Sequence, residues 1–249
     1  MLWVRSKAVE AYLGETLVGC TGLDGAVARW ATVPDVDAGV AQLREWALSA
    51  ELPIRARIWL GSTMARPLVL ASNCGAKNSR EASELASVTA GEVTGLPGEL
   101  KVWSAPWRDG RTTMAVAIRR ELLMALQSPG SSPNARRFRV DSVRPWWNQI
   151  FDPVLSRSRT QSRAIGWSLA EPDGLVHGRI EGGEVVEAAY EAPKARDPDW
   201  TLLRRRLTIG WAGADDIEHF DFDPAVSVEG KPSLFEIGRA ASMTAEADK

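Results

Sequence analysis

The side chains best suited to metal or acid–base chemistry form one acidic run near the C-terminal end of the chain. The run consists of Asp215, Asp216, Glu218, His219, Asp221 and Asp223. Side chains alternate between the two faces of a strand, so His219, Asp221 and Asp223 would share one side, opposite Phe220 and Phe222. Two-metal phosphodiester chemistry needs carboxylates that converge on the ions, usually with one from the first strand. The N-terminal strand has none, and we therefore favour a solvated strand face over a metal site.

Other residues with catalytic potential are few. The chain has two cysteines, Cys20 and Cys74, and two histidines, His177 and His219. Neither cysteine lies in a CxxC or other catalytic context, so buried free thiols are favoured over a reactive pair. His177 precedes Gly178 in a strand pattern, which favours a packed or surface histidine over a general base. Phosphate-loop, dinucleotide-binding, nucleophile-elbow and zinc-protease spacings do not occur. We therefore predict no catalytic, cofactor-binding or metal-binding residue.

Composition narrows the class of protein. The hydrophobic fraction of 45% and charged fraction of 25% are ordinary for a globular chain, and the net charge of −2 does not favour nucleic-acid binding. Eleven tryptophans against five phenylalanines and two tyrosines indicate large anchors in a core or an interface. The N-terminus lacks the apolar region of a signal peptide, and no segment approaches the ~18 apolar residues of a membrane span. We expect a cytoplasmic protein without direct membrane insertion.

Hydrophobic periodicity predicts two similar sets of elements, one at each end of the chain. The first set has strands at 2–4, 8–13, 17–20 and 27–33, a helix at 35–50 and a strand at 55–60. The second set has strands at 164–169, 174–180 and 184–190, a helix at 198–211 and a strand at 217–222. Between them lie a strand at 67–71, a helix at 78–95, a hairpin of strands 100–105 and 112–118, and a helix at 121–127. Each outer set therefore contains the order βββαβ, which one further strand precedes in the first set.

The stretch 137–155 connects these sets. It begins as a strand, and Pro145 suits the first turn of a following helix. Trp147, Ile150 and Phe151 have the spacing of a buried helical stripe. Pro153 is expected to kink or restart the helix, and 156–163 to form a polar linker. Trp146 cannot share the stripe, so it points either into the cleft between the halves or toward a partner.

The repeated unit predicts an α/β fold with mixed sheets, namely a duplicated ribonuclease-H-like (actin-like) fold of two βββαβ halves. A parallel strand needs a helical crossover, and a helix buries one face of the meander. We assign residues 1–141 to the first half, which includes the inserted strands and helices. Residues 142–225 form the second half, joined by the helix at Pro145. Residues 226–249 are expected to be a flexible C-terminal tail.

The order of elements also resembles a known family. The features that carry the resemblance are the opening strand Leu2-Trp3-Val4, strand 55–60 leading to 66–70, the helix ending at Gly95, the strands at 101–103 and 114–118, the helix at 121–126, and the strand-to-helix step at Val143-Arg144-Pro145. They resemble the actin-like cytoplasmic platform proteins of type IV pilus and type II secretion systems, which are the PilM-like proteins and the cytoplasmic domain of GspL.

The resemblance implies a place where nucleotide would bind. Active actin-like proteins hold nucleotide phosphates on two glycine-rich hairpin turns, one from each half. The N-terminal segment 2–8 has neither an acid nor a glycine, and in segment 166–174 Trp167 and Pro172 fit a phosphate cradle poorly. We therefore expect a pseudo-ATPase without a cofactor that acts as a non-catalytic scaffold. The alternative is an ATP-dependent phosphotransferase or a nuclease of the same fold.

The resemblance further implies a partner. A groove of the actin-like body would receive a short cytoplasmic segment of an inner-membrane pilus or secretion protein, as an added strand or a docked segment. An assembly ATPase is a further candidate partner, and the protein would be peripheral to the inner membrane through its partners. The candidate contacts are Arg144 and Trp146 near the middle of the chain and Arg204 and Arg205 on the last helix. For the run Arg204-Arg205-Arg206 we favour a solvated basic helix face over a partner site.

Overall fold

A computed structural model of the chain describes residues 6–21, 28–108, 110–128, 137–192, 200–211, 214, 216–222 and 237–239.

The first half is built around a five-stranded sheet. The sheet contains β1 (Lys7–Leu13), β2 (Leu17–Thr21), β3 (Arg29–Thr32), β4 (Ile54–Leu60) and β8 (Phe138–Pro145), in the order β3-β2-β1-β4-β8. The meander β1–β2–β3 is antiparallel, whereas β4 runs parallel to both β1 and β8. The predicted meander and parallel crossover are both present.

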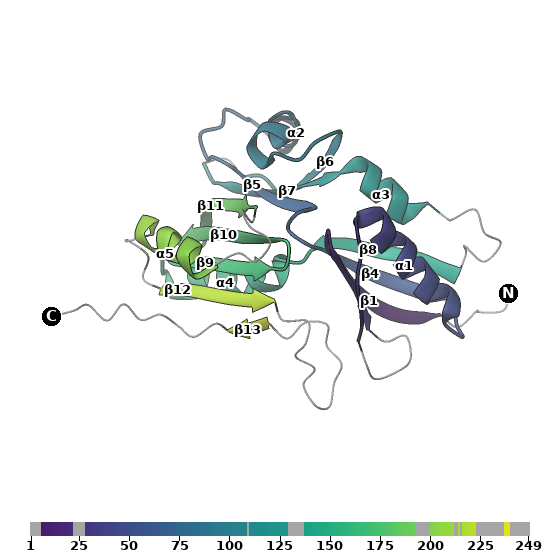
Figure 1. The fold of residues 1–249 in the computed structure, drawn as a ribbon. Helices are drawn as coiled ribbons and strands as arrows, with labels where there is room; N and C mark the ends of the chain where they lie inside the picture. Colours follow the sequence, from purple (N-terminus) through teal and green to yellow (C-terminus); the bar gives the residue numbers. More distant parts are fainter. Residues whose placement is uncertain are drawn as a thin grey trace.

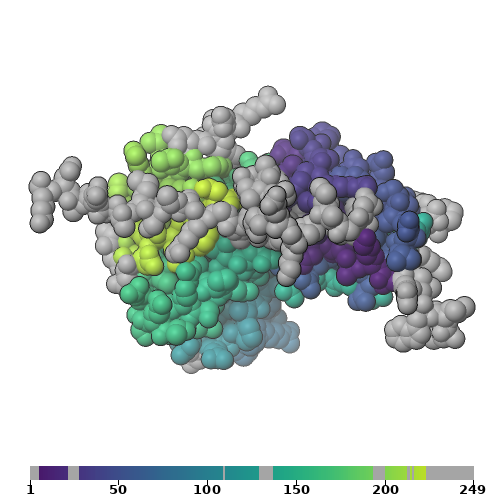
Figure 2. Space-filling model, turned by 90° about the horizontal axis from the view of Figure 1, so that it is seen from below, coloured from purple at the N-terminus to yellow at the C-terminus, as the bar shows by residue number. Residues whose placement is uncertain are grey.

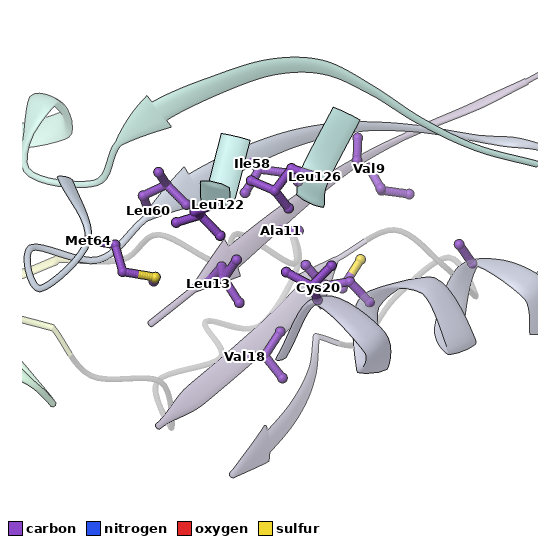
Figure 3. Packing of buried hydrophobic residues seen from close by; sticks show 14 of the residues in the cluster. Val9, Ala11, Leu13, Val18, Cys20, Ile58, Leu60, Met64, Leu122 and Leu126 are labelled. Carbon is purple, nitrogen blue, oxygen red and sulfur yellow. The ribbon is translucent and has the colours of Figure 1, made fainter. Parts of the chain in front are cut away.

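Helix α1 (Val36–Ser49) makes the crossover from β3 to β4 (Figure 1). It begins where Asp35 Oδ1 accepts a hydrogen bond from the backbone N–H of Ala38 at 2.8 Å, as expected of an N-cap. Its buried side, which includes Val40, Leu43 and Ala47, packs on the sheet. Figure 3 shows side chains of β1, β2 and β4 gathered in this core layer with Leu122 and Leu126 of α3 (Arg120–Gln127).

The second half repeats this plan. Its sheet contains β9 (Ile165–Glu171), β10 (Gly174–Glu181), β11 (Glu184–Glu191), β12 (Asp216–Phe222) and β13 (Ile237–Arg239), in the order β11-β10-β9-β12-β13. Helix α5 (Trp200–Gly210) lies between β11 and β12 in the chain, and β12 is parallel to β9. The fifth strand differs, because β13 is antiparallel to its neighbour whereas β8 is parallel. The predicted duplication of an α/β unit is therefore confirmed.

A third unit is inserted between β4 and β8. Strands β5 (Ala65–Leu70), β6 (Leu100–Ser104) and β7 (Thr113–Arg119) form an antiparallel sheet in the order β5-β7-β6. Helix α2 (Ser79–Thr94) covers it and approaches closely, because its buried side is made of Ala82, Ala86 and Ala90. The helix is capped by Asn78 and ends at Gly95, whose φ of 66° is left-handed, both as predicted. In Figure 1 this unit lies above the two halves.

The junction of the halves differs from the prediction in two ways. Pro145 ends β8, so residues 142–145 belong to the first sheet and not to the second half. Helix α4 (Asn148–Gln161) then runs without interruption past Pro153 and into the segment 156–163 that was predicted to be a polar linker. The helix persists because proline removes a single backbone donor, while Phe151, Val154 and Ser158 are buried on both sides of it.

Some predicted features lie outside the described residues. They are the strand at 2–4, the start of the last helix at 197–199 and the tail 226–249 apart from β13. Seen from below, the first half (purple to blue) and the second half (green to yellow) form two bodies side by side (Figure 2). Among the helices of the described ranges, none combines the length and apolarity needed to span a bilayer.

Candidate functional site

Three chain turns meet where the two halves face each other. The β1–β2 turn (residues 14–16) and the β9–β10 turn (residues 172–173) come from equivalent hairpins, because β1 and β9 occupy the same position in their sheets. The third turn, residues 61–64, follows β4. Equivalent strands that end at one interface bring residues more than 150 positions apart into hydrogen-bonding distance. The turns therefore form the natural candidate site of a duplicated fold.

Asp173 links the two hairpins through its carboxylate. Its Oδ2 accepts hydrogen bonds from the backbone N–H groups of Glu15 at 2.8 Å and Thr16 at 3.1 Å. Its Oδ1 accepts a hydrogen bond from the Thr16 hydroxyl at 2.5 Å. Successive N–H groups in a turn make an anion-binding concavity. Here the anion is a side chain of the other half, and we name this set of contacts the Asp173 bridge.

Glu171 makes a second link between the halves. Its Oε2 accepts hydrogen bonds from the backbone N–H of Ser62 at 2.8 Å and from the Tyr12 hydroxyl at 3.2 Å. Burial raises the pKa of Glu171 to about 8, although the hydrogen bonds from Ser62 and Tyr12 act in the opposite direction. Burial, followed by the nearby Glu171 charge, raises the pKa of Tyr12. Glu171 is therefore mainly protonated at neutral pH, and its charge is introduced only in mildly alkaline solution.

Two glycines allow the turns to approach this closely. A Cβ atom at Gly14 would lie 2.9 Å from Asp173 Oδ2 and 2.9 Å from Tyr12 Cε1. A Cβ atom at Gly61 would lie 2.7 Å from the Tyr12 hydroxyl oxygen and 3.1 Å from Glu171 Oε2. Both positions therefore need glycine for the space it leaves at the interface.

An aromatic cluster fills the same interface behind the hairpins. Trp146 is completely buried and makes edge-on contacts with Tyr12, Trp59 and Phe222, with ring centroids 6.0, 6.1 and 5.5 Å apart. Phe222 belongs to the second half and stacks on Tyr12 at 4.8 Å. The sequence left two directions for Trp146, into the cleft between the halves or toward a partner. In the structure its side chain points into the interface between the halves. Trp147 packs in the buried stripe as predicted, and its Nε1 donates to Ala65 O at 2.8 Å.

The other predicted contact residues separate into two groups. Arg204 is only 11% exposed, and its Nη2 donates to Phe220 O at 2.6 Å and to Asp221 Oδ1 at 2.8 Å. Its assignment to a partner surface is wrong, because these bonds inside the second half hold the guanidinium. The same holds for Trp146, whose side chain offers no surface. Arg144 and Arg205 are exposed.

Three residues of the acidic run, Glu218, His219 and Asp221, make contacts within the second half. Glu218 is buried and pairs with Arg157 at 2.7 Å, and Asp221 pairs with Arg204. His219 Nδ1 lies 2.8 Å from Ser168 Oγ, and burial, followed by the Arg204 charge, lowers the pKa of this histidine. In the part of the chain that the structure describes, which leaves out Asp215 and Asp223, histidine, cysteine and carboxylate side chains form no group of three suited to a metal.

Comparison with known proteins defines the fold. The sequence matches no protein-family model and no curated protein. A Bacteroides thetaiotaomicron protein with an actin-like ATPase fold and unknown function aligns at a TM-score of 0.54 and 11% identity, over 86% of this chain and 81% of that chain. The fold is actin-like. A chain of the PilM–PilN type IV pilus biogenesis complex aligns at a TM-score of 0.50 and 13% identity, over 74% of this chain and 61% of that chain. The match therefore spans less than two thirds of the PilM–PilN chain.

A third match comes from a secretion system. It is the cytoplasmic domain of EpsL, an inner membrane component of the type II secretion system of Vibrio cholerae, at a TM-score of 0.48 and 12% identity over 91% of this chain and 87% of that chain. The predicted likeness to an actin-like fold and to a pilus protein rests on the first two matches and holds at the level of the fold.

The nucleotide site that the family resemblance implies would place phosphates on the β1–β2 and β9–β10 turns. The prediction placed the first of these turns within residues 2–8, which was wrong because β1 and its turn come later in the chain. The correct turn does not fit phosphates in this arrangement. The N–H groups of Glu15 and Thr16 already donate to Asp173, whose negative charge would face any further anion.

Sequence reasoning missed Asp173 and Glu171, although a signal was available. The strands predicted at 8–13 and 17–20 leave a turn that contains Gly14 and Glu15, and those at 164–169 and 174–180 leave a turn that contains Pro172 and Asp173. Pairing the two turns as equivalent hairpins would have pointed to the carboxylates that flank Pro172. The segment 2–4 was taken as the first strand of the repeat, so the expected phosphate-binding turn was assigned to residues 2–8 and not to the turn after β1.

We expect Asp173→Ala to lower the free energy of unfolding by about 1–2 kcal/mol, because three hydrogen bonds to one carboxylate are lost at a half-exposed site. Urea denaturation at pH 7 measures the change. Glu92→Ala, on the exposed side of α2, is the matched control and should change stability by less than about 0.5 kcal/mol. Equal stability of the two variants would show that the Asp173 bridge does not form in solution.

Proposed function

We propose that this chain is a non-catalytic actin-like scaffold on the cytoplasmic side of a bacterial pilus-assembly or secretion machine. In this role it binds a short cytoplasmic segment of an inner-membrane partner. The observation that carries the proposal is the Asp173 bridge, in which a carboxylate takes the N–H groups that would hold nucleotide phosphates. A body without a working nucleotide site is suited to assembly and not to phosphoryl transfer.

The contacts between the halves support a fixed body. The Asp173 bridge, the Glu171 hydrogen bonds and the cluster around Trp146 connect the two halves directly. The inserted unit adds a further link, because the Arg66 guanidinium lies 4.1 Å above the Tyr190 ring of β11. Nucleotide-driven opening and closing would have to break these contacts, whereas a scaffold benefits from them.

The partner is proposed from the likeness in fold to a chain of the PilM–PilN complex, a type IV pilus biogenesis complex. We keep Arg144, at the end of β8, and Arg205, on α5, as candidate contacts because both are exposed. Guanidinium groups at such positions favour segments that carry carboxylates. An assembly ATPase is a second candidate partner, and either partner would place the protein at the inner membrane.

Isothermal titration with Mg-ATP tests the loss of the nucleotide site. The wild-type chain is expected to give no binding heat. The N–H groups of the β1–β2 turn already donate to Asp173, and the negative charge of Asp173 would repel phosphates. Asp173→Ala frees the donors and is the variant in which weak binding could reappear, while Glu92→Ala is the control. Micromolar affinity in the wild type would contradict the proposal and favour the phosphotransferase or nuclease alternative.

The partner is tested through the genes that adjoin this one. Cytoplasmic segments of any neighbouring single-span membrane proteins would be synthesised as peptides and titrated against the chain by fluorescence polarisation. One of them is expected to bind, and Arg144→Glu or Arg205→Glu should weaken that binding at least tenfold, or about 1.4 kcal/mol. A neighbourhood without pilus or secretion genes, or no binding by any peptide, would count against the scaffold role.

A further inference from the structure

A cavity of about 510 Å³ lies between the inserted unit and the second half. The segment joining β6 to β7, the helix α4 and the β10–β11 turn surround it. Because β10 is eight residues long, its two ends are about 25 Å apart, and the cavity lies at the end opposite to the Asp173 bridge. It is therefore a site separate from the hairpin turns.

The floor of the cavity is apolar. Phe151 of α4 and Val185 of β11 are each 6% exposed and belong to the core around the tryptophans, and Met114 and Leu155 are packed against that core. Carbon surface at the base of a concave site gives a ligand its anchoring contacts. A large apolar side chain inserted here would extend an existing hydrophobic core.

The rim of the cavity is cationic. Arg108, Arg111 and Arg159 line it and are exposed, whereas Glu184 is the one carboxylate among the described lining residues. Glu184 pairs with Arg111 at 3.4 Å. Asp109, beside Arg108 in sequence, lies outside the described residues. The described rim thus carries an excess of positive charge on a chain whose net charge is −2.

The Arg159 side chain is held along the rim by the β10–β11 turn. Its Nε donates to Gly183 O at 3.3 Å. A Cβ atom at Gly183 would lie 2.2 Å from Arg159 Cγ, so only glycine leaves room for the aliphatic stem. This packing limits the conformations of Arg159 and lowers the entropy cost of its pairing with a carboxylate.

We propose that this cavity binds an acidic peptide segment of a partner protein, which inserts one large apolar side chain between flanking carboxylates. The proposal rests on the scaffold function above and names a groove and a ligand chemistry for it. Guanidinium–carboxylate pairs at the rim would give orientation, and the apolar anchor would give affinity. Three arginines around one cavity are too few and too local for a nucleic-acid backbone, which is tracked by a longer basic surface.

A short fluorescein-labelled peptide in which glutamate and leucine alternate is the probe, and the same peptide with lysine in place of glutamate is its control. Fluorescence polarisation is expected to show binding of the glutamate peptide alone. The double variant Arg108→Glu with Arg159→Glu should weaken this binding at least tenfold. The control is Arg80→Glu with Arg139→Glu, an equal charge change at two exposed positions that do not line the cavity, and it should leave the binding unchanged. Circular dichroism and thermal unfolding establish that each variant is folded.

Equal binding of both peptides, or an unchanged affinity in the double variant, would overturn the proposal. If a natural partner segment still binds the double variant as tightly as the wild type, the cavity is not the docking site, although the scaffold function remains. Binding of Mg-ATP by the wild type would instead contradict the proposed scaffold function, whatever the result with the peptides.

Discussion

Trp146→Ala is expected to lower the free energy of unfolding by about 3–5 kcal/mol, the usual cost of truncating a large buried aromatic side chain. The indole is completely buried and contacts rings from both halves, namely Tyr12 and Trp59 of the first and Phe222 of the second. Its loss therefore leaves a cavity at the interface and also removes edge-on aromatic contacts.

Urea denaturation followed by circular dichroism measures this loss. Trp103→Ala is the matched control, because Trp103 lies on β6 with 44% of its surface exposed, and it should cost about 1 kcal/mol or less. A stable Trp146→Ala variant that has lost partner binding would instead return Trp146 to the surface role that the sequence left open. A loss of about 3–5 kcal/mol in the free energy of unfolding supports the place of Trp146 in the interface.

Glu171→Gln is expected to remove a large pH dependence of stability. Burial raises the pKa of this carboxyl from the ordinary 4.5 to about 8 in the folded chain. Between these values the folded chain binds more protons than the unfolded chain, so the stability contribution is complete below pH 4.5 and is lost as pH rises through 8. The slope reaches about 1.4 kcal/mol per pH unit. Glutamine keeps an acceptor for Ser62 N–H and never ionises.

The measurement compares wild type and Glu171→Gln by urea denaturation at pH 7 and pH 9. His177 and His219 are present in both proteins, so their contribution to the pH dependence cancels in the comparison. The stability of wild type relative to the variant should fall by roughly 1.4 kcal/mol from pH 7 to pH 9. Glu92→Gln is the exposed control and should show no change relative to wild type. Parallel pH curves for wild type and Glu171→Gln would contradict the raised pKa of the buried carboxyl.

Local pattern was enough to predict most elements of this fold. The stripe of α1, the caps at Asp35 and Asn78 and the left-handed end at Gly95 are short-range features, each set within a few residues. The repeat βββαβ follows from such features in sequence, and it led to the actin-like fold before any contact was known. Boundaries were less certain, because Pro153 reads as a helix break while its buried neighbours hold α4 together.

The sequence by itself determined most of the elements, their repeated order and, through that order, the actin-like fold. Only the tertiary structure decided the interface, where Asp173 binds N–H groups about 158 positions away, Trp146 faces inward, and Arg204 pairs with Asp221. The physical reason is the separation in sequence between the residues that interact. Periodicity and capping depend on neighbours in the chain, whereas the use of a carboxylate or an indole at an interface depends on which turn of the other half lies opposite.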